Sequence, residues 1–439
     1  MKMRNLVAIG LAGSLVLAAC GGDDDDDTAT EDDGDSESSA FAAPPEDTEA
    51  TLRVWLNAND TPDSMREWAI AEFAEQYPNV DVEIETQDWD GLVERLTSSL
   101  SSQDSPDIVE MGNTQAQQFE AAGALVNLTD VQEDLGGDDL VDSLAEAGTY
   151  NGDFYGLPLY GGARVVTYRT DLFEASGLEI PTTMEDFVET AETLHADNVS
   201  TPNFSGFVTH GRNWHLMLSF LWDAGGGIAS QDDSGEWVNE LGSEESVEGL
   251  TTVQNLMQNA NQAPADADDA NDFVEFCNGE IGMLLAPAWK QGQLLDPEQG
   301  CPETMDGNIG AFALPGTDGG VAPSFLGGSV LGISAQSENA ALAYQFLLLI
   351  SGEGFQEQYP QNGLLPARKS LLGEMTGDEW AMAQAAAAEN TRFTPSSENW
   401  AEVEGQDILQ DMGTAISSGG DVEEEATRAG DAIVEILNS

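Results

Sequence analysis

FYGLPLYGGARVVTYRTDLF, from Phe154 to Phe173, is the stretch of sequence that decides the fold. Its first half is aromatic and rich in glycine, and its second half is an alternating, β-branched run that is typical of a strand. Gly161 and Gly162 carry no side chain, so a ligand or another backbone can approach closely there. Arg164 is one of only 13 lysines and arginines, against 81 aspartates and glutamates. A scarce cation beside two glycines predicts a binding wall where the chain crosses between two lobes, although an ion pair with one of the many carboxylates would explain Arg164 equally well.

Strands alternate with helices before this crossing. The apolar periodicity predicts strands at 51–56, 80–84 and 107–111 and helices at 64–77, 92–100 and 115–125. This order predicts a mostly parallel sheet, because parallel neighbours need a crossover that a helix supplies. In such sheets ligands bind beyond the carboxyl ends of the strands, which selects Asn57 and Asp60 in the first loop and Asn113 and Thr114 after the third strand. Asn113 and Thr114 could equally cap the helix that follows them.

The part of the chain after the crossing continues with strands and helices and ends in helices. Helices are predicted at 184–195, 210–222, 244–259, 271–278, 340–350, 377–389 and 406–416, and strands at 205–209, 309–314 and 330–334 and within 279–289. The fold class is therefore α/β.

The beginning of the chain predicts export. Lys2 and Arg4 precede an apolar run at 6–17 that is shorter than the roughly 20 residues of a spanning helix. The run closes on Leu-Ala-Ala-Cys-Gly, which resembles a bacterial lipobox. We therefore expect residues 1–19 to be a lipoprotein signal peptide and Cys20 to be the lipidated first residue of the mature protein; the alternative is ordinary secretion. The lipid is the expected membrane attachment, at the extracytoplasmic face of the cell membrane.

Residues 20–49 are strongly acidic and have few large apolar side chains, which predicts a disordered, solvated tether. A calcium site is disfavoured because the spaced oxygen ligands and the turn glycine of a calcium loop are missing. The net charge of -68 disfavours nucleic acid and anionic membrane surfaces as partners, because both would be repelled. The acidic residues are spread along the chain, which we interpret as surface adaptation, plausibly to high salt.

Cys277 and Cys301 are the two remaining cysteines. In an exported protein they are a natural disulfide pair, closing a loop of about 25 residues that is worth about 3 kcal/mol. A metal site there is disfavoured because no histidine or third cysteine is close in sequence. We expect neither a metal nor a cofactor.

Several motifs, in chain order, resemble family 1 extracellular solute-binding proteins, the carbohydrate-capturing lipoproteins of ABC importers. They are DIVEMGNT at 107–114, YGLP at 155–158, YRTDLF at 168–173, NGEIGM at 278–283, FLGGS at 325–329 and GLLPAR at 363–368. DWDGL at 88–92, the 110–115 stretch and FLWDAGG at 220–226 look closest to the actinobacterial diacetylchitobiose-type and maltose-type binders.

The resemblance implies a two-lobe, periplasmic-binding-protein-like fold with discontinuous domains, each lobe a mostly parallel sheet flanked by helices. Lobe one would be 51–161 plus about 310–351, and lobe two about 162–309 plus 352–439. A di- or oligosaccharide would lie in the hinge cleft, and the closed protein, a monomer, would deliver it to membrane permease subunits.

A sugar offers an apolar ring face and a rim of hydroxyls, so its site needs flat aromatics and polar groups. The aromatic candidates are Trp289, where the resemblance places a stacking tryptophan, then Trp214 beside His215, and Trp400; each could instead belong to the core. The polar candidates are Asn57, Asp60, Asn113, Thr114, Tyr160 and Arg164, with Gly328 and Ser329 contributing their backbone amides.

Two other classes of function remain as alternatives. A secreted glycoside hydrolase needs two carboxylates flanking a bond, and with 81 acidic residues some pair is always arguable. The expected lipid anchor and the absence of a Gly-x-Ser-x-Gly motif favour a protein that is not an enzyme. A binder of a non-sugar solute, such as a polyamine, iron or glycerol phosphate, is the other alternative.

Overall fold

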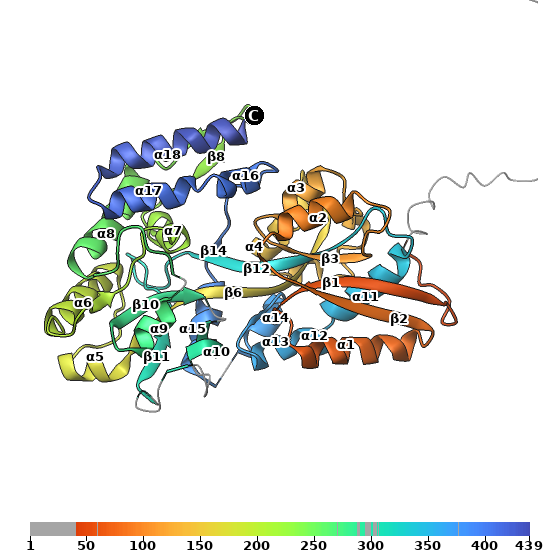
Figure 1. Cartoon of the computed structure of the whole chain (residues 1–439), viewed down its shortest axis with the longest axis horizontal. Helices are drawn as coiled ribbons and strands as arrows, with labels where there is room; N and C mark the ends of the chain where they lie inside the picture. The colour runs from red at the N-terminus through yellow and green to blue at the C-terminus, as the bar shows by residue number, and fades with distance from the viewer. Residues whose placement is uncertain are drawn as a thin grey trace, which may run out of the picture. The chain divides into compact units, whose positions relative to one another are not determined.

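Strand β6 (Gly156–Arg169) lies at the centre of a ten-stranded sheet and belongs to both of its halves (Figure 1). Its first part pairs with β12 (Ser324–Ile333), and its last part pairs with β10 (Ile281–Pro287) and β11 (Ile309–Phe312). The computed structural model describes residues 41–58, 60–269, 271–287, 290–294, 300–301, 305, 307–375 and 377–439. Within them the strand order is β2-β1-β3-β12-β6-β10-β7, so the stretch at 154–173 joins the two halves as predicted.

The first half of the sheet contains β1 (Ala50–Asn57), β2 (Val80–Gln87) and β3 (Ile108–Gly112). These three strands are parallel, as predicted, and β12 runs antiparallel to β3. Helices α1 (Asp63–Gln76) and α11 (Ala340–Ser351) pack on one face, where the ring centroids of Phe73 and Phe346 are 5.4 Å apart. The second core cluster of this half contains residues of α2 (Leu92–Leu100) and α3 (Ala116–Ala121).

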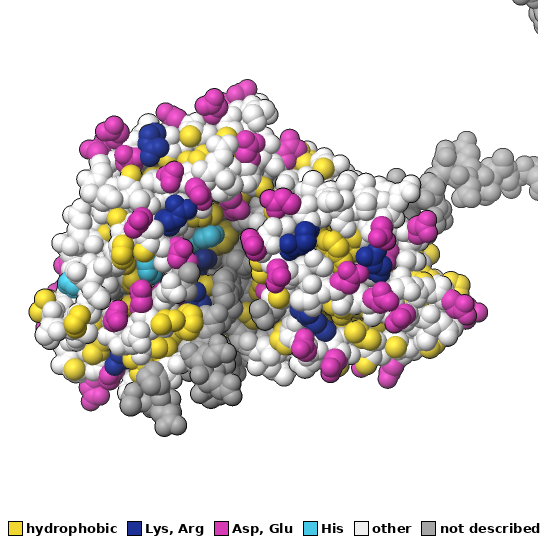
Figure 2. All heavy atoms as spheres, in the orientation of Figure 1, with side chains coloured by type: hydrophobic (Ala, Val, Ile, Leu, Met, Phe, Trp, Pro, Cys, Tyr) yellow, Lys and Arg dark blue, Asp and Glu magenta, His cyan; other side chains and the backbone are white. Residues whose placement is uncertain are grey.

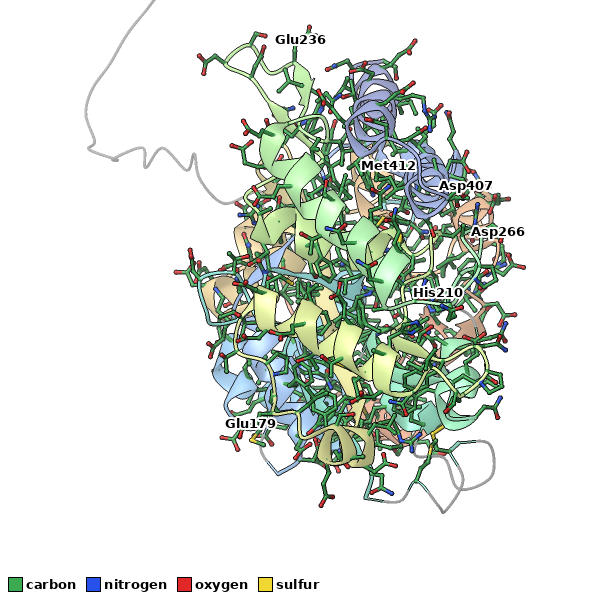
Figure 3. The ribbon with its side chains drawn as sticks, turned by 90° about the vertical axis from the view of Figure 1, so that its left-hand side faces the viewer. Glu179, His210, Glu236, Asp266, Asp407 and Met412 are labelled. Atoms are coloured by element: carbon green, nitrogen blue, oxygen red, sulfur yellow. A yellow bond between two sulfur atoms is a disulfide. The ribbon has the colours of Figure 1, made fainter. Side chains whose placement is uncertain are left out.

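The second half adds β7 (Ser205–Phe207), parallel to β10. Its helices are α5 (Thr170–Ser176), α6 (Met184–Asp197), α7 (Trp214–Asp223), α8 (Glu244–Asn259), α17 (Ile408–Ser417) and α18 (Val422–Leu437). Figure 3 views this half from its outer side, with α6 and α8 in front and the α17–α18 pair beside them. Met412 of α17 is buried there in the largest apolar cluster.

The remaining elements are short helices and strand pairs. They are α4 (Asp142–Ala147), β4 (Thr149–Tyr150), β5 (Asp153–Phe154), β8 (Ala229–Gln231), β9 (Trp237–Asn239), α9 (Asp272–Cys277), α10 (Lys290–Leu294), α12 (Glu353–Gln356), α13 (Gln358–Gln361), β13 (Leu365–Pro366), α14 (Lys369–Leu372), α15 (Glu379–Ala388), β14 (Thr391–Arg392) and α16 (Trp400–Gly405). Together with the helices above, they make the α/β architecture that the sequence predicted.

Two glycine pairs face each other where β6 and β12 cross between the halves. Gly161 is opposite Gly328, and Gly162 is opposite Gly327. A Cβ atom on Gly328 would lie 2.3 Å from the carbonyl oxygen of Tyr160, closer than real atoms approach. Only glycine fits at this position, because the two backbones are in contact there.

Three segments differ from the expected boundaries. β11 pairs with the second half of β6, so the return to the first half begins with β12 and not near residue 310. Phe355 and Tyr359 are buried in the first core, so α12 and α13 belong with it and it extends beyond residue 351. β12 starts at Ser324, before the expected 330, because its glycines pair with those of β6.

The predictions for the N-terminal segment concern residues that lie mostly outside the described ones, Cys20 and the signal peptide included. The end of the expected tether is described, and it is not solvated throughout, because the ring of Phe41 packs on Tyr344 at 5.0 Å. Cys277 and Cys301 form a disulfide. Across the described helices, none combines the length and the apolar character that crossing a membrane requires.

Candidate ligand site

The candidate site lies on one face of the crossing strands. Side chains alternate along a strand, so Tyr160, Gly162 and Arg164 share a face of β6. Ser329, opposite Tyr160, and Phe325, whose ring lies 5.7 Å from the guanidinium of Arg164, share the matching face of β12. Gly161 and Ala163 are directed to the other face, against apolar residues such as Leu144 and Leu326. We call this set of side chains, with the loops that reach it, the junction site; in Figure 2 the surface is hollowed along the line where the two halves meet.

A pair of hydrogen-bonded carboxyl groups occupies the first-half end of the junction site. Oε1 of Glu110 accepts from the hydroxyl of Ser329 at 2.5 Å, and Oε2 accepts from the backbone N–H of Asn57 at 2.7 Å. Burial, and then the charge of Asp60, raise the pKa of Glu110 well above its ordinary range. The two carboxyl groups therefore affect one another, and burial favours the neutral form of Glu110.

Asp60 is the second member of the pair. Burial raises its pKa, while hydrogen bonds from Glu110, Tyr160 and Trp89 oppose that rise. Tyr160 is itself fixed by stacking on Tyr359, with ring centroids 5.7 Å apart. The carboxyl oxygens of this partly buried side chain can accept hydrogen bonds from a ligand.

Two side chains of this first-half end have polar atoms without a partner among the described residues. Oδ1 and Nδ2 of Asn57 and Oδ2 of Asp60 are buried and make no hydrogen bond, and Asn57 is 0 % exposed. A buried polar group without a partner costs about 1–3 kcal/mol. Ligand hydroxyls would satisfy these atoms, because a hydroxyl both donates and accepts.

Arg164 lies at the second-half end of the junction site. It is 6 % exposed, and its Nε and Nη1 atoms have no hydrogen-bond partner. Burial lowers its pKa to about 10, which leaves the guanidinium charged at neutral pH. Arg164 forms no ion pair with a described residue. The two acids whose charges act on it, Asp269 and Asp272, pair with Lys290 instead, whose Nζ lies 2.7 Å from Asp272 and 3.6 Å from Asp269.

Aromatic side chains surround Arg164. Trp214 stacks on His215 with ring centroids 3.8 Å apart, and both rings approach Phe325. Burial, and then the charge of Arg164, lower the pKa of His215 well below its ordinary range, so this imidazole is neutral. The guanidinium therefore lies beside an aromatic wall formed by the uncharged rings of Trp214, His215 and Phe325.

A short hydrogen-bond chain links the two halves beside the junction site. The indole Nε1 of Trp400 donates to Glu404 at 3.0 Å, and the hydroxyl of Thr114 donates to the other oxygen of Glu404 at 3.2 Å. Burial raises the pKa of Glu404. Thr114 of the first half thus helps to orient Trp400 through Glu404. The ring centroid of Trp400 lies 6.2 Å from that of Trp214 in the aromatic wall.

The structure brings most of the predicted residues together, with different roles. Asn57, Asp60, Tyr160 and Arg164 place polar atoms in the junction site. Three other predicted residues are engaged within the protein: Asn113 donates from Nδ2 to the carbonyl of Leu326 and accepts from the N–H of Thr114, while Ser329 binds Glu110. Neither Asn113 nor Thr114 caps α3, where no side-chain cap bond forms. Gly328 is packed against Tyr160, and Trp289 lies outside the described residues.

Sequence reasoning missed Glu110, Phe325 and Glu404. Glu110 had a usable signal, because it is the only ionisable residue in the otherwise apolar strand Ile108–Gly112, and a buried acid requires a partner. Glu404 had no signal among so many acidic residues. No group of three histidine, cysteine, aspartate or glutamate side chains that could hold a metal is found in the described part of the chain.

Comparison with known proteins decides the family. A family model described as bacterial extracellular solute-binding protein matches residues 58–357. The chain belongs to this family. A curated member, the diacetylchitobiose binding protein DasA of Streptomyces coelicolor, is 29 % identical over 410 residues, covering 92 % of this chain and 91 % of the relative.

Solved structures of solute-binding proteins share the fold. The GacH receptor of Streptomyces glaucescens has a TM-score of 0.74 at 20 % identity, covering 89 % of this chain and 99 % of that one. The sugar-binding protein MalE of Xanthomonas citri has a TM-score of 0.76 at 21 % identity, covering 88 % and 97 %. The two-lobe α/β fold that the sequence predicted is confirmed, and these relatives are binding proteins. The prediction of a mostly parallel sheet in each lobe was wrong, because the two halves share one mixed sheet in which β6 and β12 pair antiparallel with their neighbours in the strand order.

Proposed function

We propose that this extracellular solute-binding protein captures a di- or oligosaccharide in the junction site and delivers it to the permease of an ABC import system. The supporting observation is the set of buried, partnerless polar atoms on Asn57, Asp60 and Arg164, placed on either side of a glycine floor and beside stacked aromatic rings. Sugar hydroxyls match the polar atoms, and the apolar face of a sugar ring matches the aromatic wall.

The ligand contacts come from both halves of the sheet. Asn57 ends β1 and Asp60 follows it, whereas Trp214 begins α7 of the second half. A ligand that touches both sets favours the arrangement in which they are closest, and so shifts the protein toward a closed form. We further propose that the protein acts as a monomer and is held at the extracytoplasmic face of the membrane by lipid on Cys20.

The carboxyl pair does not support the hydrolase alternative. Asp60 and Glu110 interact directly, and each affects the pKa of the other. The two carboxyl groups of a glycosidase flank the scissile bond, about 5–5.5 Å apart in retaining enzymes and more in inverting ones. Two touching groups leave no room for a sugar linkage between them.

Isothermal titration calorimetry tests the proposal with a panel of diacetylchitobiose, cellobiose, maltose, maltotriose, spermidine and glycerol phosphate. We expect saturable binding of at least one oligosaccharide, with no reducing-sugar product after prolonged incubation. Product formation would favour the hydrolase, and binding of spermidine or glycerol phosphate alone would refute a sugar ligand.

The variant Asp60→Asn tests the site itself. It replaces a charge-assisted hydrogen bond with a neutral one of about half the strength, so affinity for the bound sugar should fall about tenfold. Asp63→Asn, on the exposed first turn of α1, is the matched control and should leave affinity unchanged. Equal affinities of both variants would remove Asp60 from the site.

A further inference from the structure

One segment of the second half reaches across to the first half. Residues 391–404, which we call the clasp segment, leave the crossing strands at β14 and continue into α16 (Figure 1). Trp400 and Val403 anchor the segment in the core of the second half, where each is 1 % exposed. Asn399 also donates from Nδ2 to the carbonyl of Ile436 in α18. The clasp segment therefore moves with the second half.

Four side-chain hydrogen bonds join the clasp segment to the first half, within the part of the chain that the structure describes. Each bond uses a hydroxyl group, and three of them end on a carboxylate. They are Ser143 with Thr391 at 2.9 Å, Ser396 to Glu146 at 2.9 Å, Tyr150 to Glu398 at 2.9 Å, and Thr114 to Glu404 at 3.2 Å. The first half thus contributes groups from α4, from β4 and from the turn after β3.

These contacts differ in how far they lie from the strands that both halves share. Thr391 belongs to β14, which pairs with β12, so its bond with Ser143 lies beside the crossing strands. Helix α16, which contains Glu404, lies away from those strands and beside α3 (Figure 1). A rotation of the halves about the shared strands changes a contact beside them least and separates the outer contacts. The bonds of Tyr150 and Thr114 are therefore the ones that break when the halves separate.

The donors in these contacts are neutral. The chain has 13 lysines and arginines against 81 acidic residues, and no ion pair of the described residues joins the clasp segment to the first half. A hydroxyl that donates to a carboxylate forms a strong hydrogen bond, and water can replace it when the two groups separate. Such a bond also remains in 1 M salt, because charges still interact over about 3 Å there. The contact is therefore reversible and tolerates salt.

We propose that the clasp segment holds the two halves together before any sugar binds. The bonds from Tyr150 to Glu398 and from Thr114 to Glu404 favour the arrangement in which the halves touch, and so they set how often the junction site opens. A sugar enters while these bonds are broken, and their re-formation holds it in place. This last consequence rests on the proposed function, whereas the equilibrium between the two arrangements is a property of the ligand-free protein.

Double electron–electron resonance on the ligand-free protein tests this proposal. Spin labels on Ser98→Cys of α2 and Glu435→Cys of α18, two exposed positions, report the distance between the halves. Cys20→Ser prevents a third label, because Cys277 and Cys301 are joined in a disulfide. The labelled protein should show a main distance, for molecules whose halves touch, and a minor, longer one for molecules whose halves have separated.

The combined variant Tyr150→Phe and Thr114→Val removes both outer hydroxyls and keeps the shapes of the two side chains. It should raise the ratio of separated to touching molecules at least about fivefold, because each lost bond ended on a carboxylate. Tyr344→Phe is the matched control, since that hydroxyl donates to Asp134 within the first half at 3.2 Å. The control should keep the distances of the parent protein, and the increase in the combined variant should persist in 1 M potassium chloride.

Each other outcome has a distinct meaning. Unchanged distances in the combined variant would refute the clasp, and so would an equal shift in Tyr344→Phe, because the position of the hydroxyl would then not matter. Loss of the increase in 1 M salt would refute the hydroxyl bonds as its cause. If circular dichroism shows the combined variant to be partly unfolded, Tyr150→Phe alone must show the longer distance. Failure of every sugar in the calorimetric panel to bind would refute the proposed function instead, and the distances would still decide the clasp.

Discussion

Replacing Glu120 with glutamine should make the protein more stable at neutral pH and leave it unchanged in acid. Glu120 lies on α3, is 2 % exposed, and has no hydrogen-bond partner for either carboxyl oxygen. Burial raises its pKa from 4.5 to about 8. At pH 7 the native protein therefore holds a proton that the unfolded chain has released.

The size of the effect follows from this difference in bound protons. Between pH 4.5 and 8 the native state binds one proton more than the unfolded state at this group, so the free energy of unfolding falls by about 1.4 kcal/mol per pH unit. The loss reaches about 3.5 kcal/mol at pH 7 and about 5 kcal/mol above pH 8. Glu120→Gln keeps the shape and cannot ionise, so it removes this loss.

Urea unfolding at pH 5, 7 and 9 and constant salt measures the effect. The variant should exceed the wild type by less than about 1 kcal/mol at pH 5, by about 3.5 kcal/mol at pH 7 and by about 5 kcal/mol at pH 9. Glu75→Gln, on the exposed side of α1, is the control and should show no such divergence. A constant difference between Glu120→Gln and wild type across the three pH values would refute the reasoning, because a pH-independent effect cannot come from a buried proton.

Three further changes have defined outcomes. Glu110→Gln, which mimics the neutral acid, should flatten the decline of stability as pH rises, because the raised pKa of Glu110 makes the native state retain a proton; chemical unfolding at several pH values checks this, and an unchanged pH profile would contradict it. Gly328→Ala should cost about 1–3 kcal/mol in urea unfolding by overpacking, whereas Gly373→Ala, with open space around it, should cost far less. Replacing Cys277 and Cys301 with serine should cost about 3 kcal/mol; no change in the urea midpoint would show that the bridge does not restrict the unfolded chain.

Local pattern was sufficient for much of the fold. Helix α2 has the predicted bounds Leu92–Leu100, and β1 and β2 begin within one residue of their predicted starts, because apolar periodicity is a local property. The boundaries between the two lobes were harder to predict from the sequence. Helices α12 and α13 pack in the core of the first half through Phe355 and Tyr359. Nothing in their own sequence states which lobe they would pack on.

For the site, too, sequence position indicated candidate residues, whereas contacts between distant segments could not be predicted. Positions at and after the end of the first strand selected Asn57 and Asp60, and the structure places both near Glu110, because the topology of a parallel sheet brings the ends of neighbouring strands together. The interaction of Asp60 with Glu110 depends on two segments 50 residues apart and on their burial, which no spacing reveals. For Arg164 the decisive fact is that it lacks a carboxylate partner among the described residues, and the sequence alone favoured an ion pair equally.

The use of the cations has a consequence for how this protein should be handled. Ten of the eleven described lysines and arginines are tied to fixed partners, so the many remaining surface carboxylates, which dominate the charged side chains in Figure 2, have few cations of the chain to offset them. Their mutual repulsion is reduced mainly by dissolved ions. The distance over which two exposed charges still interact is about 10 Å at 0.1 M salt and only about 3 Å at 1 M. Dialysis into dilute buffer should therefore loosen this protein, and potassium or sodium chloride should restore it.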